Sequence, residues 1–193
     1  MRDYLLTIIG VGLLFLGSLR YAVDTAKRRV RANRVTWAIW TVVSLTCFIA
    51  QLHSGVGLVS ALTLATGIGP FLVLLATIRN PHAYTQITRL DACCGFLAII
   101  SLALWALTSN PNFNIVILIT VDWFGALPLL VKTYRAAQPE GASTYLFWAL
   151  AGAVTLTTVH DWRFAAYGVP LNAVIMSTAL LSAAVTSRQR LLT

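Results

Sequence analysis

The sequence predicts an all-α integral membrane protein with seven transmembrane helices. Hydrophobic residues make up 58% of the chain and charged residues only 10%, whereas roughly a quarter of the residues in a soluble domain are charged. The apolar residues form seven stretches close to the ~20 residues that a helix needs to cross the bilayer core. Polar or charged residues divide these stretches, and the basic ones gather in alternate gaps.

The positions of these gaps define the expected helices. The first stretch is a retained helix rather than a signal peptide, because its basic cluster follows the apolar run instead of preceding it. The short turns at 53–55 and 160–163 must be hairpins, since ~40 apolar residues would cross the bilayer twice. The expected helices are 4–23, 35–53, 56–78, 91–109, 113–134, 143–160 and 163–187.

The basic residues predict the orientation of the chain. Only Arg2 and Arg163 fall in the gaps on one side, whereas eleven basic residues fall on the other. Because positive loops stay in the cytoplasm, we expect the N-terminus outside and the C-terminus inside, in a bacterial inner membrane. The charges form no continuous basic face, which argues against nucleic acid as a partner. The eleven residues are Lys27, Arg28, Arg29, Arg31, Arg34, Arg79, Arg89, Lys132, Arg135, Arg188 and Arg190.

A shift of 108 residues aligns the first three expected helices with the last three. Because one helix lies between them, both units keep the same orientation, which predicts a parallel repeat with a substrate site at the interface near the midplane. We expect a first unit at 1–78, a linker helix at 79–112 and a second unit at 113–193. The identical pairs are Gly17 and Gly125, Leu19 and Leu127, Val23 and Val131, Thr25 and Thr133, Thr36 and Thr144, and Trp40 and Trp148.

Residues 127–135 (LPLLVKTYR) and 140–143 (EGAS), followed by an aromatic-rich stretch, resemble the PQ-loop pattern of the PQ-loop and SWEET-like transporters. The resemblance implies a 3+1+3 helix plan, movement of a small solute by alternating access, and gating at Pro128. Two positions depart from the pattern. Leu129 stands where the family has glutamine, and Arg20 is the first-unit match of Pro128.

A second resemblance lies in the last expected helix, where residues 167–172 (YGVPLN) are similar to elements of SWEET proteins. This similarity implies that Asn172 lines a solute pocket. Its match in the first unit is Leu64, so we expect no symmetric pair of asparagines. Polar contact between helices, worth about 0.6 kcal/mol on average, is an equally good interpretation of Asn172.

Asp122 is the strongest candidate for a functional side chain. It lies about 14 Å into the fifth expected helix, near the bilayer centre. A carboxylate there costs at least about 2.5 kcal/mol, so it should face a cavity or a partner. It could bind a cationic substrate, form a hydrogen bond to a polar one, or carry a coupling proton. The alternative is a structural hydrogen bond between helices.

Glycines and prolines indicate where the helices could bend. Pro128 removes a backbone hydrogen bond, and with Gly125 it predicts a gating hinge in the fifth helix. Pro170, close to Gly168, predicts a comparable hinge in the seventh. Proline and glycine are also common in membrane helices without such a role.

Tryptophans lie near several expected helix ends. Trp40 and Trp148 occupy matching positions in the two units, so they could bind a ligand from both halves. The favoured alternative is that they anchor the chain at the membrane interface, as Trp37 and Trp162 would.

These patterns favour a transporter or facilitator of a small polar solute, with the lipid bilayer as its surroundings. The alternative function is a non-transporting seven-helix receptor or assembly protein, similar in architecture to the KDEL receptor. A homo-oligomer packed through the small residues 151–153 is a further interpretation. No nucleophile and base pair, phosphate-binding glycine loop or zinc motif is present in the sequence, so we expect no enzyme, catalytic residue, cofactor or metal.

Overall fold

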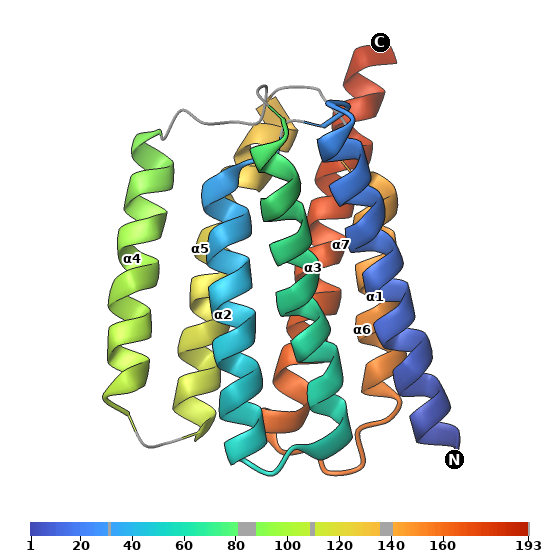
Figure 1. Cartoon of the computed structure of the whole chain (residues 1–193), viewed down its shortest axis with the longest axis vertical. Helices are drawn as coiled ribbons and strands as arrows, with labels where there is room; N and C mark the ends of the chain where they lie inside the picture. Colours follow the sequence, from blue (N-terminus) through green and yellow to red (C-terminus); the bar gives the residue numbers. More distant parts are fainter. Residues whose placement is uncertain (31, 81–87, 109–110, 136–140, 193) are drawn as a thin grey trace.

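The computed structural model describes residues 1–30, 32–80, 88–108, 111–135 and 141–192. These residues form seven α-helices that run along the molecule in alternating directions (Figure 1). The predicted all-α architecture is therefore confirmed. The helices are α1 Arg2–Ala26, α2 Arg34–His53, α3 Ser60–Ile78, α4 Arg89–Ala106, α5 Pro111–Arg135, α6 Ala142–Leu156 and α7 Phe164–Leu192, and a 3-10 turn, η1 Gly57–Val59, precedes α3.

Four segments are long and apolar enough to cross a membrane. They are α1, α2, the continuous segment Gly57–Ile78, and Phe164–Ser187 within α7. Two further helices contain shorter apolar segments, Ile115–Val131 in α5 and Ala142–Leu156, which is all of α6. At 1.5 Å per residue α6 is about 23 Å long, somewhat less than the hydrocarbon core of a typical bilayer.

The end of α6 differs from the prediction, because the helix stops at Leu156 and not at residue 160. Two threonine hydroxyls donate back into the helix, Thr157 to the carbonyl oxygen of Val154 and Thr158 to that of Thr155. The backbone N–H groups of Thr157 and Thr158 also bond three residues back. The chain therefore leaves the α-helical pattern in a tight turn after Leu156.

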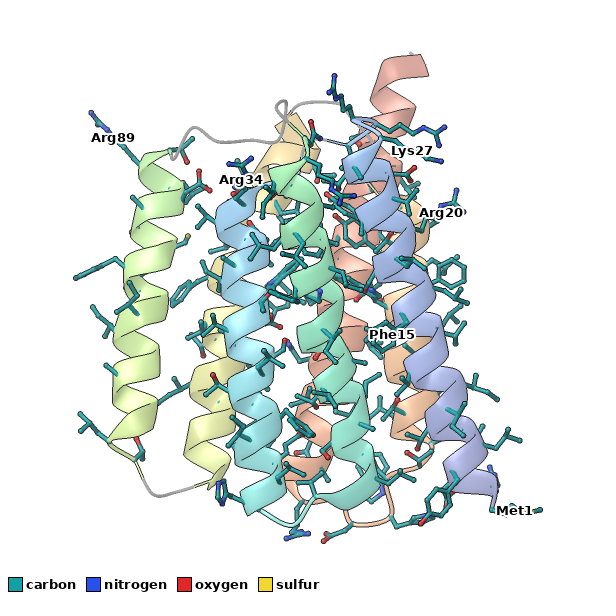
Figure 2. The ribbon with its side chains drawn as sticks, in the orientation of Figure 1. Met1, Phe15, Arg20, Lys27, Arg34 and Arg89 are labelled. Atoms are coloured by element: carbon teal, nitrogen blue, oxygen red, sulfur yellow. The ribbon has the colours of Figure 1, made fainter. Side chains whose placement is uncertain are left out.

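Basic side chains mark one end of the bundle. Lys27, Arg34 and Arg89 lie at the end opposite Met1 (Figure 2). Arg20 projects outward from α1 near the same end and is exposed. The charge asymmetry of the sequence is thus an asymmetry between the two ends of the molecule.

Six helices form one closed ring of contacts in the order α1, α3, α2, α5, α7 and α6, in which α1–α3 are called the first group and α5–α7 the second. In the first group α3 packs against both α1 and α2, and in the second α7 packs against both α5 and α6. The groups meet where α1 packs on α6 and where α2 packs on α5. Helix α4 lies at the edge, mainly against α5 (Figure 1).

An aromatic cluster fills the core between the groups. Trp37, Trp40 and Trp148 are at most 6% exposed, and their ring centroids lie 5.1 to 5.9 Å apart. The interpretation of these three residues as membrane-interface anchors is therefore wrong. Sequence position gives the depth of a residue along a helix but not the direction of its side chain, and these point into the bundle. Trp162 is 65% exposed.

Helix α4 is tied to α2 by a buried hydrogen bond at the basic end of the bundle. Asn33 is the N-cap of α2, and its Nδ2 donates to Oδ1 of Asp91 at 2.7 Å. Asp91 in turn accepts from the backbone N–H and hydroxyl of Thr88 at the start of α4. The side chains at the starts of α2 and α4 therefore satisfy each other's hydrogen-bonding groups.

Candidate functional site

A cavity of about 60 Å³ lies between the two groups of helices. This volume has room for a few water-sized groups. Six helices, all except α4, contribute to its lining. The polar lining residues are Trp40 and Ser44 from α2, Thr63 and Thr66 from α3, Asp122 from α5, Trp148 from α6, and Asn172 and Ser177 from α7.

Asp122 and Asn172 meet at the cavity. Asn172 Nδ2 donates to Asp122 Oδ2 at 2.8 Å, and Asn172 Oδ1 accepts from Trp123 Nε1 at 2.8 Å. Because an indole nitrogen can only donate, Trp123 fixes which side of the amide faces Asp122. Asp122 lies about 16 Å along α5 and Asn172 about 12 Å along α7 at 1.5 Å per residue, so both sit deep in the bundle.

The two matching tryptophans also reach the cavity. Trp40 Nε1 donates to the backbone carbonyl oxygen of Asp122 at 3.0 Å, and Trp148 Nε1 donates to Ser18 Oγ at 3.1 Å. Their ring centroids are 5.8 Å apart and the planes cross at 69°. The indoles therefore form an angled wall, one from each group of helices, rather than two parallel plates.

Two lining hydroxyls are buried without a partner. Thr63 Oγ1 in α3 and Ser177 Oγ in α7 belong to residues only 1% exposed, and neither forms a hydrogen bond within the described part of the chain. Buried polar groups are normally satisfied by protein or water, so both hydroxyls are available to a polar group inside the cavity.

The predicted hinge residues Gly125, Pro128 and Pro170 lie in α5 and α7, two of the helices that line the cavity, but are not themselves part of its lining. Gly125 packs against α2, where an added Cβ would lie 3.1 Å from Trp40 Cδ1 and Ile39 Cγ2. Pro128 is buried inside α5, and Pro170 lies inside α7, its carbonyl oxygen 2.8 Å from the place of a Cβ on Gly152. Pro70, inside α3, lines the cavity itself.

Sequence reasoning brought Asp122, Asn172, Trp40 and Trp148 forward, and the structure places all four at one cavity. Sequence reasoning gave no indication of Trp123, because its role depends on the direction in which the side chain of the neighbouring Asp122 points. It also missed Ser44 and Ser177, because a serine in an apolar helix commonly bonds to its own backbone and carries no signal of its own.

A second cavity, of about 310 Å³, lies at the end of the bundle that holds the N-terminus, opposite Lys27, Arg34 and Arg89. Asp3 at the start of α1 contacts His160 in the α6–α7 connection at 2.9 Å, and Arg163 pairs with Asp161 there. These side chains are exposed, so such pairs contribute little to stability.

Comparison with known proteins identifies no relative of this chain. No family model matches the chain, and no curated protein or solved structure matches it either.

Proposed function

We propose that this chain is a transporter or facilitator of a small polar solute, working by alternating access between the units 1–78 and 113–193. In this proposal seven helices span the membrane and α4 is the linker. The observation that carries it is a mostly apolar cavity, with Asp122 and Asn172 in its wall, between two groups of helices whose packing is related. Alternating access requires a site of this kind, closed in turn from either side.

The packing partners support the repeat. Exchanging α1 with α5, α2 with α6 and α3 with α7 converts the first group into the second. The same exchange turns the contact between α1 and α6 into the contact between α5 and α2. Both contacts occur in the structure. The 3+1+3 plan of the PQ-loop and SWEET-like transporters has this arrangement.

Individual contacts support the repeat at the 108-residue shift. An added Cβ on Gly17 would meet Phe147 and Trp148, and one on Gly125 would meet Ile39 and Trp40. Phe147 and Trp148 are the residues that the shift aligns with Ile39 and Trp40. The cavity follows the same relation, because Leu14 and Asp122 are aligned and both line it.

In the proposed mechanism the two units rock about the cavity. Solute is held between Asp122 and Asn172 on one side and the indoles of Trp40 and Trp148 on the other. Pro128 and Pro170 each leave a carbonyl without its helical partner, so α5 and α7 can bend at those positions. The cavity must open for a solute to enter or leave it, because its present volume has room only for small groups.

Uptake into proteoliposomes tests the proposal. A radiolabelled panel of sugars, amino acids, nucleosides and amines is offered to the parent and to Asp122→Asn, with Asp24→Asn as the matched control. Asp24 lies outside the cavity, in an exposed pair with Arg29. We expect saturable uptake that falls at least tenfold in Asp122→Asn only. Binding without uptake by folded protein would instead support the receptor alternative.

A further inference from the structure

We propose that the central cavity binds a small organic ammonium ion in preference to neutral and anionic solutes. This inference rests on the proposed function for its biological role, but the binding itself can be measured without transport. It is carried by a carboxylate without a counter-charge, two unpartnered hydroxyls and two indoles that line one cavity.

The carboxylate lacks a charged partner. Among the described residues that line the cavity, Asp122 is the one acidic side chain, and none is Lys, Arg or His. The ion pairs of the described residues do not include Asp122. Asn172 supplies one hydrogen bond but no charge. A bound cation would supply the opposite charge that the ionised carboxylate lacks at this depth, whereas an anion beside it would add repulsion in a medium of low dielectric constant.

The unpartnered hydroxyls match an ammonium group. Thr63 Oγ1 and Ser177 Oγ come from α3 and α7, so they approach the cavity from both groups of helices. An alkylammonium has up to three N–H donors and no acceptor. Its nitrogen can therefore donate to hydroxyl oxygens and to the second oxygen of Asp122, which accepts no hydrogen bond from the described residues.

The remaining lining favours an organic ion over a metal ion. Leu14, Val43, Ile119 and Met176 give the cavity apolar walls, and indole faces attract ammonium ions that have given up water. A small inorganic cation requires a shell of oxygen ligands, which these walls do not provide. The ion we infer therefore carries a short carbon chain, as the cavity volume of about 60 Å³ requires.

Three solutes of nearly equal size isolate the effect of charge. Ethanolammonium, ethylene glycol and glycolate share a hydroxymethyl group and differ in charge. Equilibrium binding of each to the full chain in lipid nanodiscs is measured by radioligand, with sodium as a competitor. We expect ethanolammonium to bind at least tenfold more tightly than the other two. Equal or tighter binding of ethylene glycol or glycolate, or displacement by equimolar sodium, overturns the inference.

Two pairs of variants locate the site. Asp122→Asn keeps an acceptor for Asn172 and removes the charge, so ethanolammonium affinity should fall at least tenfold, while Asp24→Asn leaves it unchanged. Thr63→Val removes one cavity hydroxyl and should weaken binding several-fold, while Thr178→Val, on the exposed face of α7, should not. Equal losses within either pair contradict the assignment. Circular dichroism and gel filtration establish that each variant is folded.

The same ligands separate this inference from the proposed function. If ethylene glycol or glycolate is taken up and ethanolammonium is not, the protein is a transporter and the cation site is refuted. If ethanolammonium binds tightly and no solute is taken up, the cation site is supported and the proposed transport function is refuted.

Discussion

The amide nitrogen of Asn172 lies 2.8 Å from Oδ2 of Asp122, and this hydrogen bond joins α7 to α5 beside the central cavity. Trp123 of α5 donates to the oxygen of the same amide. The Asn172 side chain therefore donates one hydrogen bond to α5 and accepts another from it. The arrangement fixes the carboxylate at a defined position on the cavity wall.

Replacing Asn172 with leucine removes both bonds at nearly constant volume. Interhelical hydrogen bonds in membranes are worth about 0.6 kcal/mol on average, so the two together amount to about 1 kcal/mol. We expect Asn172→Leu to lower the free energy of unfolding by roughly that amount, or more because Asp122 loses a donor. Urea or SDS titration in mixed micelles measures the loss. Unchanged stability would contradict the geometry described for this amide.

Trp123→Phe tests the bond that holds the Asn172 oxygen. A benzene ring remains but the pyrrole ring and its N–H are lost, so the Asn172 amide keeps its bond to Asp122 and loses the other. We expect a stability loss of at least about 0.6 kcal/mol, because side-chain volume is lost with the hydrogen bond, together with a several-fold fall in solute affinity. Trp162→Phe, at an exposed position, is the control and should change neither quantity.

Glycine contacts between the two groups of helices predict opposite effects of one substitution. Gly125→Ala places a Cβ 3.1 Å from Trp40 and Ile39 and should destabilise the protein by about 1–3 kcal/mol. Gly12→Ala, where nothing lies within 4 Å, should stabilise by up to about 1 kcal/mol through helix propensity. Thermal unfolding of the two variants gives the comparison, and equal shifts in both would count against the packing.

The bond between Asn33 and Asp91 predicts a coupled pair at the basic end. Asn33→Ser keeps an N-cap oxygen for α2 but does not reach Asp91, whereas Asp91→Ala keeps the Thr88 hydroxyl at the start of α4 and removes the carboxylate that accepts from Thr88. Helix caps and buried hydrogen bonds each contribute about 1 kcal/mol. A double-mutant cycle should give a coupling of about 1 kcal/mol between the two sites, and strictly additive losses would contradict it.

Cysteine labelling tests the orientation. In a chain without its three native cysteines, Trp162→Cys in the connection between α6 and α7, and Lys27→Cys at the end opposite Met1 (Figure 2), introduce exposed thiols. A membrane-impermeant maleimide should label Trp162→Cys in intact cells and Lys27→Cys only after permeabilisation. The reverse pattern would refute the orientation inferred from the basic residues.

The sequence predicts the helices well because each must be long and apolar, and gaps between apolar stretches are easily located. It predicts depth but not direction. Asp122 therefore lies well inside α5 as expected, whereas Trp37 points into the core and not toward the membrane interface. The bond between Asn33 and Asp91 links residues 58 apart in the chain, and no local pattern announces it. The early end of α6 is a tight turn of backbone bonds three residues back, which a hydropathy pattern does not reveal.

Gly17 and Gly125 offer bare backbone to the flat edges of Trp148 and Trp40. Because neither glycine has a Cβ, the helix backbones can approach closely beside the indoles, on α1 with α6 and on α5 with α2. Hydrogen bonds cross the same contacts, from Thr144 to the carbonyl oxygen of Gly17, from Trp148 to Ser18 and from Trp40 to the carbonyl oxygen of Asp122. Each close approach is therefore fixed in one register along the helix axes.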